Sequence, residues 1–167
     1  MKSIPTKRLT LLALWAAVAV ILSWVESQIP LTSFLPPGAK AGLSNVVVMF
    51  LAAEVSLPAA LAVAAFKALF ALVTRGGVAA LMSAAGGLTS ALALWLVAKG
   101  NLGCLGLGVT GALTHNAAQL AAALLLAGPA VTAYAPALLL TALASGTLTA
   151  FLLWLLAPRM GTLWKER

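Results

Sequence analysis

The chain is dominated by long apolar runs, separated by short stretches rich in Gly, Pro and polar residues. Six such runs follow one another, at residues 9–25, 42–53, 58–73, 78–98, 105–127 and 135–157. A helix that crosses a bilayer needs about 20 mainly apolar residues, and the longer runs approach that length. Because backbone polar groups inside lipid must be satisfied by the segment itself, the pattern predicts an all-α polytopic membrane protein with about six transmembrane helices.

The composition agrees with this prediction. Hydrophobic residues make up 63% of the 167 positions and charged residues 8%, whereas a typical soluble domain carries about 25% charged residues. A water-soluble globule of this length has too little interior to bury so much apolar surface. We therefore expect residues 1–167 to form a single integral membrane domain.

The second apolar run is too short to cross a bilayer unaided. About 12 residues that rise about 1.5 Å each reach about 18 Å of a hydrocarbon core that is about 30 Å thick. We expect this segment either to be extended by residues 37–41 or to be a broken helix buried among the other helices.

The basic residues favour an orientation with both termini in the cytoplasm. In that orientation seven of the ten Lys and Arg lie inside, Lys40 and Arg75 lie outside, and Lys67 lies within a span; cytoplasmic loops typically carry such an excess. The same balance makes nucleic acid an unlikely partner class, because the cations border the apolar runs. A cleaved signal peptide is less favoured, since residues 23–26 offer no small-residue cleavage site.

The inventory of reactive side chains excludes much chemistry. The chain has three acids, no Asp, one His and one Cys. These residues are too few for the common catalytic and metal sites. Mg²⁺ binding needs clustered carboxylates, acid–base catalysis by carboxylates needs a pair in one site, and a zinc or haem site needs more His or Cys ligands. The sequence predicts no metal, no cofactor, no catalytic residue and no enzymatic activity.

Lys67 lies near the middle of the third span, where a lysine costs about 2.5–3.5 kcal/mol to insert. Glu26, at the outer end of the first span, is the acid within reach. Two interpretations stay open: a structural Lys67–Glu26 pair or simple snorkelling, and a side chain that faces a ligand.

The fifth span carries a polar stripe. Its residues Gly108, Gly111, His115 and Gln119 fall on one helical face, and Asn116 lies about 100° around the helix. The glycines allow a close approach and the polar groups supply donors and acceptors at membrane depth. Hydrogen bonds between helices and contacts to a ligand both fit the stripe.

The loop at residues 36–45 combines stiffening prolines with Gly38, Gly42 and the cation Lys40. Together with Lys67 and Arg75 it places three cations against one acid on the outer half. We expect an anionic or strongly hydrogen-bonding ligand to approach from outside. The alternative is that Lys40 and Arg75 contact lipid headgroups.

The chain resembles the Gx transporter family in three motifs that follow one another in the family's order. They are the loop motif at 37–45, the SAAGG stretch at 83–87 and the HNAAQ stretch at 115–119. This family is also labelled heptaprenyl diphosphate synthase component I, and it is similar to the substrate-binding S components of energy-coupling factor transporters. We expect the family to carry Arg where this chain has Lys67 and Gly where it has Ala71. The first difference keeps the charge but loses bidentate geometry.

The resemblance implies a six-helix S-component fold in a bacterial inner membrane, with a pocket near the outer face covered by residues 29–42. A separate transmembrane coupling protein and two cytosolic ATPases would drive uptake, and the small residues Ala13 and Ala17 would meet the coupling protein. We expect the substrate to contact Lys40, Asn45, Lys67, Arg75, His115, Asn116 and Gln119. Close backbone approach is expected at Gly38, Gly42, Gly86 and Gly87.

Three functional hypotheses follow. The leading one is a substrate-binding subunit for uptake of a small anionic or amphiphilic metabolite; the chain has no GxxxxGK[ST] loop, so an external ATPase would supply the energy. The second is a noncatalytic scaffold or lipid-binding accessory of isoprenoid or quinone synthesis, because prenyl diphosphate synthases use Asp-rich motifs and this chain has no Asp. The third and weakest is a secondary carrier that uses His115 for proton coupling.

Overall fold

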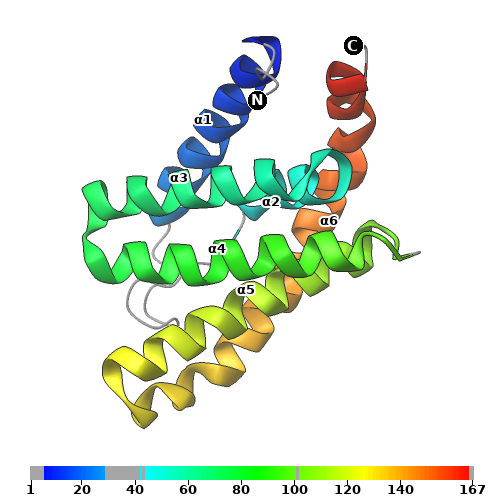
Figure 1. The fold of residues 1–167 in the computed structure, drawn as a ribbon. Coiled ribbons are helices and arrows are strands. Elements are labelled where there is room, and N and C mark those ends of the chain that lie inside the picture. Colours follow the sequence, from blue (N-terminus) through cyan, green and yellow to red (C-terminus); the bar gives the residue numbers. More distant parts are fainter. Residues whose placement is uncertain (1–5, 29–41, 43, 101, 166–167) are drawn as a thin grey trace.

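The computed structural model describes residues 6–28, 42, 44–100 and 102–165, and every regular element within them is helical (Figure 1). This confirms the all-α prediction. In chain order the elements are α1 (Thr6–Gln28), α2 (Asn45–Phe50), the π-helical turn η2 (Leu51–Val55), α3 (Leu57–Arg75), α4 (Gly77–Val97), α5 (Cys104–Ala127), the 3-10 helix η3 (Pro129–Tyr134) and α6 (Ala135–Lys165).

The boundaries of the helices follow from local chemistry. Ser56 is extended and its hydroxyl accepts a hydrogen bond from the Ala59 backbone N–H, so it caps the start of α3. Gly76, with φ +86°, ends α3, and Gly128, with φ +76°, ends α5. This left-handed backbone region favours glycine, which explains why two of the turns come at glycines.

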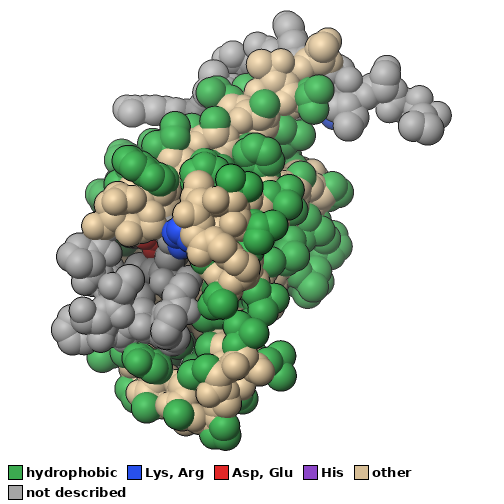
Figure 2. Space-filling model, turned by 90° about the vertical axis from the view of Figure 1, so that its left-hand side faces the viewer, with side chains coloured by type: hydrophobic (Ala, Val, Ile, Leu, Met, Phe, Trp, Pro, Cys, Tyr) green, Lys and Arg blue, Asp and Glu red, His purple; other side chains and the backbone are tan. Residues whose placement is uncertain are grey.

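Five helical segments of the described chain are long and apolar enough to cross a membrane: 8–28, 57–75, 77–97, 104–127 and 129–156. Their outward side chains are apolar, as the 87% exposure of Leu125 and the 86% exposure of Val73 illustrate. Figure 2 likewise shows hydrophobic side chains spread widely over the visible face. Such a surface suits lipid, and the protein is a multi-pass membrane protein.

The short second helix is enclosed by the others. All six residues of α2 are buried, and α2 contacts α1, α3, α4, α5 and α6. Phe50 of α2 and Leu51 of η2 are fully buried, and they lie in a core that also includes residues of α1, α3, α4, α5 and α6. Of the two alternatives for this segment, the structure thus shows the broken, buried helix.

The long helices pack as sequential neighbours, α3 along α4, α4 along α5 and α5 along α6. Figure 1 shows the α3–α4 turn at the left of the view and the α5–η3–α6 connection at the lower left, whereas α1 begins and α6 ends at the top. α1 therefore begins and α6 ends on the same side of the bundle, and the cytoplasmic location of that side stays a prediction. α1 lies at the edge, where it packs against α3 and α2.

α5 and α6 approach each other through glycine. A Cβ added at Gly108 would collide with the carbonyl oxygen of Gly146 and would lie 2.7 Å from the Cβ of Ala150. A Cβ added at Gly146 would lie 2.9 Å from the Cα of Val109. Small residues at an interface are the usual means of packing helices tightly in lipid, so these glycines set the distance between α5 and α6.

The last helix is longer than its apolar run. The run ends at residue 157, whereas α6 continues through Pro158 to Lys165. Hydropathy marks where the chain leaves the hydrocarbon core, and a helix can continue into the polar interface beyond that point. The end of the apolar run therefore did not predict the end of the helix, which lies eight residues later.

We predict that Gly108→Ala destabilises the protein by about 1–3 kcal/mol, the usual cost of overpacking a tight interface. Gly77→Ala is the matched control, since nothing lies within 4 Å of a Cβ at that position. The free energy of unfolding in mixed micelles, measured by denaturant titration, compares the two. Equal stability of both variants would contradict the proposed close contact.

Candidate functional site

Polar side chains from α1, α3, α4 and α5, together with the segment before α2, surround a small cavity inside the bundle. We call it the polar cavity, and its lining consists of Ser23, Glu26, Gly42, Ser44, Lys67, Arg75, Ser83, His115 and Gln119. Its volume of about 10 Å³ approximates the space that one water molecule needs. Figure 2 shows basic and acidic side-chain surface next to each other at one place on the visible face.

Lys67 is buried, with 4% of its surface exposed. Its Nζ donates a hydrogen bond of 2.9 Å to Oδ1 of Asn45, the first residue of α2. A buried ammonium is tolerated in a membrane only when polar partners surround it. The Lys67–Asn45 bond therefore ties α3 to the start of the central helix.

Glu26 holds the segment that leads into α2. One carboxylate oxygen accepts a hydrogen bond from the Gly42 backbone N–H, and the other accepts one of 3.4 Å from the Ser44 hydroxyl. Gly42 has φ +93°, a conformation that side-chain-bearing residues rarely adopt. Glu26 and Gly42 together fix where the chain begins its central helix.

His115 lies against the backbone of α4. A Cβ added at Gly86 would be 2.6 Å from both Cε1 and Nδ1 of the imidazole ring. The ring occupies the space that a side chain at position 86 would need. Gly87 serves a different contact, because a Cβ there would lie 3.3 Å from the Cβ of Ala64 on α3.

Three polar atoms at this site lack a hydrogen-bond partner within the described part of the chain. They are Nδ2 of Asn45, Nδ1 of His115 and Oε1 of Gln119, on side chains that are 6%, 4% and 2% exposed. A buried polar atom without a partner costs about 1–3 kcal/mol. Such atoms are expected where a ligand or an ordered water completes the network.

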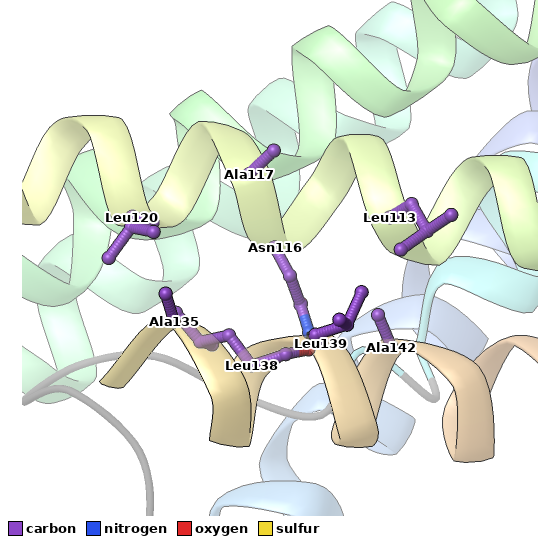
Figure 3. Close-up of a pocket in the computed structure, with 8 residues that line it drawn as sticks. All are labelled: Leu113, Asn116, Ala117, Leu120, Ala135, Leu138, Leu139 and Ala142. Carbon is purple, nitrogen blue, oxygen red and sulfur yellow. Dashed lines mark hydrogen bonds between the residues drawn. The ribbon is translucent and has the colours of Figure 1, made fainter. Parts of the chain in front are cut away.

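Asn116 lies outside the polar cavity. Its Nδ2 donates to the Leu138 carbonyl oxygen at 2.8 Å and to the Thr141 hydroxyl at 3.2 Å. As Figure 3 shows, Asn116 reaches from α5 toward α6. It lines an apolar groove of about 150 Å³ between these helices, which we call the α5–α6 groove, with Leu113, Ala117, Leu120, Ala135, Leu138, Leu139 and Ala142.

The structure thus brings Asn45, Lys67, Arg75, His115 and Gln119 to one region, with Gly42 and Gly86 beside them. Asn116, which we also expected to contact the substrate, lies about a quarter turn away on α5 and faces α6.

The remaining predicted residues lie elsewhere. Gly38, Lys40 and most of the predicted covering loop at 29–42 fall outside the described residues. Ala13 and Ala17 are exposed on α1.

Three serines line the polar cavity without having been predicted as site residues: Ser44 and Ser83, which lie within motifs noted in the sequence, and Ser23, which does not. Ser23 shows which signal was missed. It is 3% exposed and lies one helical turn before Glu26 on α1. Its i, i+3 spacing from the one acid of this helix places both on the same face, and this pattern was available in the sequence.

Comparison with known proteins yields one match. The family model described as heptaprenyl diphosphate synthase component I matches residues 15–156, which is most of the chain. No curated protein and no solved structure matches.

We predict that Gly86→Ala displaces His115 and destabilises the protein by about 1–3 kcal/mol. His115→Ala should create room for the new methyl group. The double variant should then lose less stability than the two single variants lose together, by about 1 kcal/mol or more. A double-mutant cycle of unfolding free energies measures this coupling, and strict additivity would show that the ring and Gly86 are not in contact.

Proposed function

The chain belongs to the heptaprenyl diphosphate synthase component I family, and on that premise we propose that it is the substrate-binding membrane subunit of an uptake system. The substrate is a small anionic or amphiphilic metabolite. It enters the polar cavity, where Lys67 and Arg75 attract it and Asn45, His115 and Gln119 orient it.

The observation that carries this proposal is the polar cavity itself. Two cations, Lys67 and Arg75, and one acid, Glu26, line it, so its formal charge is 2 − 1 = +1 with a neutral histidine. Glu26 already accepts two hydrogen bonds from the segment before α2. A lining with a net positive charge and unpartnered polar atoms favours an anion.

A cavity of water size must enlarge to admit a metabolite. The groups that would separate are few: Glu26 on α1 holds residues 42 and 44, and Asn45 is bonded to Lys67 on α3. α1 packs only at the edge of the bundle. A shift of α1 with the segment before α2 would open the cavity while the α3–α4–α5–α6 packing stays intact.

Energy for uptake would come from partners. The sequence has no phosphate-binding loop for ATP, so a transmembrane coupling protein and cytosolic ATPases are proposed. The exposed Ala13 and Ala17 on α1 offer the small-residue face that such a partner needs.

A second function is favoured by the α5–α6 groove. Its lining is apolar except for Asn116. One lining residue, Leu139, is 53% exposed, so the groove reaches the outer surface of the bundle. An apolar chain of a membrane lipid or an isoprenoid fits such a groove. The chain would then be a noncatalytic, lipid-binding accessory of isoprenoid synthesis, as the family description suggests.

We predict that wild-type protein retains an anionic small molecule through purification and that Lys67→Met lowers its occupancy more than tenfold. Loss of a buried charge-assisted contact commonly costs more than the 1.4 kcal/mol that corresponds to about tenfold. Lys99→Met is the matched control, because Lys99 lies over the Trp95 ring at 3.5 Å, outside the polar cavity. Mass spectrometry of the extracted molecules gives the occupancy, and equal retention by all three proteins would remove the assigned pocket.

Co-purification from native membranes separates the two functions. We expect a coupling protein with ATPases to be recovered with the wild type and lost with Ala13→Leu/Ala17→Leu. Ala62→Leu, an exposed alanine on α3, is the control and should retain the partners. Recovery of a soluble prenyl synthase in place of the ATPases would favour the accessory function.

A further inference from the structure

The α5–α6 groove carries one polar atom that the packing of the two helices leaves unused. Asn116, which is 3% exposed, lines the groove, and its Oδ1 has no hydrogen-bond partner among the described residues. The other described residues of the lining are all Ala or Leu. As Figure 3 shows, the side chain of Asn116 extends from α5 into the space between the two helices. The groove therefore offers one acceptor in apolar surroundings.

The nitrogen of this amide fixes its orientation. Nδ2 donates to the Leu138 carbonyl oxygen at 2.8 Å and to the Thr141 hydroxyl oxygen at 3.2 Å. A carbonyl oxygen only accepts, so turning the amide over would place Oδ1 against another acceptor. The Thr141 hydroxyl cannot donate to Oδ1 instead, because it donates to the Leu138 carbonyl oxygen at 3.0 Å. Only an occupant that brings its own donor satisfies Oδ1.

Neither water nor an ordinary phospholipid supplies that donor well. A buried water needs about two to four polar partners, whereas the described lining leaves one atom unpaired. Asn116 lies near the middle of α5 (Cys104–Ala127), about 17 Å along the axis from either end. Phospholipid headgroups lie outside the hydrocarbon core, which is about 30 Å thick. At the depth of Asn116 a phospholipid therefore brings only the methylene groups of its chains.

The groove also disfavours a charged occupant. No Lys, Arg, His, Asp or Glu is present among the described residues that line it. An ionised group in apolar surroundings without a counterion pays a large desolvation cost. An ionised carboxylate or diphosphate would also bring acceptors to a site whose unpaired atom is an acceptor. The occupant is therefore a neutral molecule with an O–H or N–H group.

We propose that the α5–α6 groove binds an isoprenoid alcohol, an inference that rests on the second function proposed above. The hydroxyl donates to Oδ1 of Asn116. The family description supplies the isoprenoid chain, and the groove supplies the preference for the alcohol over its diphosphate. A volume of about 150 Å³ holds about five non-hydrogen atoms at about 30 Å³ each, so the groove takes the hydroxyl-bearing end. The rest of the chain continues past the half-exposed Leu139 into the lipid.

The hydroxyl should contribute strongly to affinity. A site that bonds a hydroxyl rejects an analogue without it, because the buried Oδ1 of Asn116 then stays unpaired. Such a loss corresponds to about 5- to 150-fold in affinity. The methyl ether of the same alcohol keeps the chain and the oxygen but has no donor, so it is the matched probe.

The experiment compares geraniol with geranyl methyl ether. Purified full-length protein in nanodiscs binds tritiated geraniol, the two unlabelled probes compete for it, and empty nanodiscs give the partition of each probe into lipid. After correction for partition, wild type should require about fivefold less geraniol than ether, or less still, for half displacement. Asn116→Leu should remove this difference, because the acceptor is lost while the groove still takes an apolar chain.

Further variants locate the site. Ala117→Leu, at an exposed alanine of the lining, fills the groove and should weaken binding of both probes by about fivefold or more. Ala121→Leu, at an exposed alanine one turn further along α5, is its matched control and should bind as wild type does. Thr147→Val removes an exposed hydroxyl of α6 outside the groove and should keep the preference for geraniol. Asn116→Met replaces Asn116→Leu if size-exclusion chromatography shows that variant to be poorly folded.

The outcomes separate the inference from the second function. Equal competition by the two probes in wild type, or a preference for geraniol that persists in the Asn116 variants, would overturn the inference. If Ala117→Leu still weakened the binding of both probes in that case, the groove would remain a site for apolar chains and the second function would stand. Absence of binding by either probe above the nanodisc background would overturn both.

Discussion

The whole bundle depends on enclosing one helix that is too short for the membrane. α2 and η2 span residues 45–55, and every residue of α2 is buried. In hydrocarbon, the ends of such a helix expose backbone groups that lipid cannot satisfy. The surrounding helices therefore have to supply the partners. Glu26 bonds the backbone just before α2, and Lys67 bonds the side chain of its first residue. This requirement explains why an acid and a base lie at membrane depth at the same place.

The enclosure also locates the site. An N-terminal helix end inside a membrane protein gathers polar groups, and it is where broken helices of transporters bind anions. Here the gathering point lies at the junction of α1, α3, α4 and α5, beside the turn at Gly42. The glycines at 42 and 86 leave room at this junction, and the imidazole of His115 fills one of those spaces. Space and charge thus occur together, in a core that is otherwise made of close-packed apolar side chains.

The sequence predicted the features that depend on neighbours along the chain. Apolar run length identified the five long helices and the short second one, and helical periodicity placed Gly108, Gly111, His115 and Gln119 on one buried face. Contacts between helices depend on how distant segments meet, and periodicity carries no information about them. Only the structure therefore revealed three contacts between distant segments. They are the contacts of His115 with Gly86, of Gly108 with Gly146 and of Glu26 with Gly42. Asn116 was expected to contact the same substrate in spite of its 100° offset, whereas the structure shows that it bonds to α6.

A purely structural role for the polar cavity would make a different arrangement favourable. If these groups served only to join helices, selection for stability would leave each donor with an acceptor. A buried polar atom without a partner lowers stability, and an apolar side chain in its place is often as stable as a buried polar pair. Asn116 joins α5 to α6 through Nδ2, which has two acceptors on α6, although its Oδ1 also lacks a partner among the described residues. What distinguishes the polar cavity is that three such atoms, on Asn45, His115 and Gln119, lie together there within the part of the chain that the structure describes. One bound molecule or ordered water would pair with these atoms together, whereas a joining role accounts for the Lys67–Asn45 bond and for the bonds from Gly42 and Ser44 to Glu26.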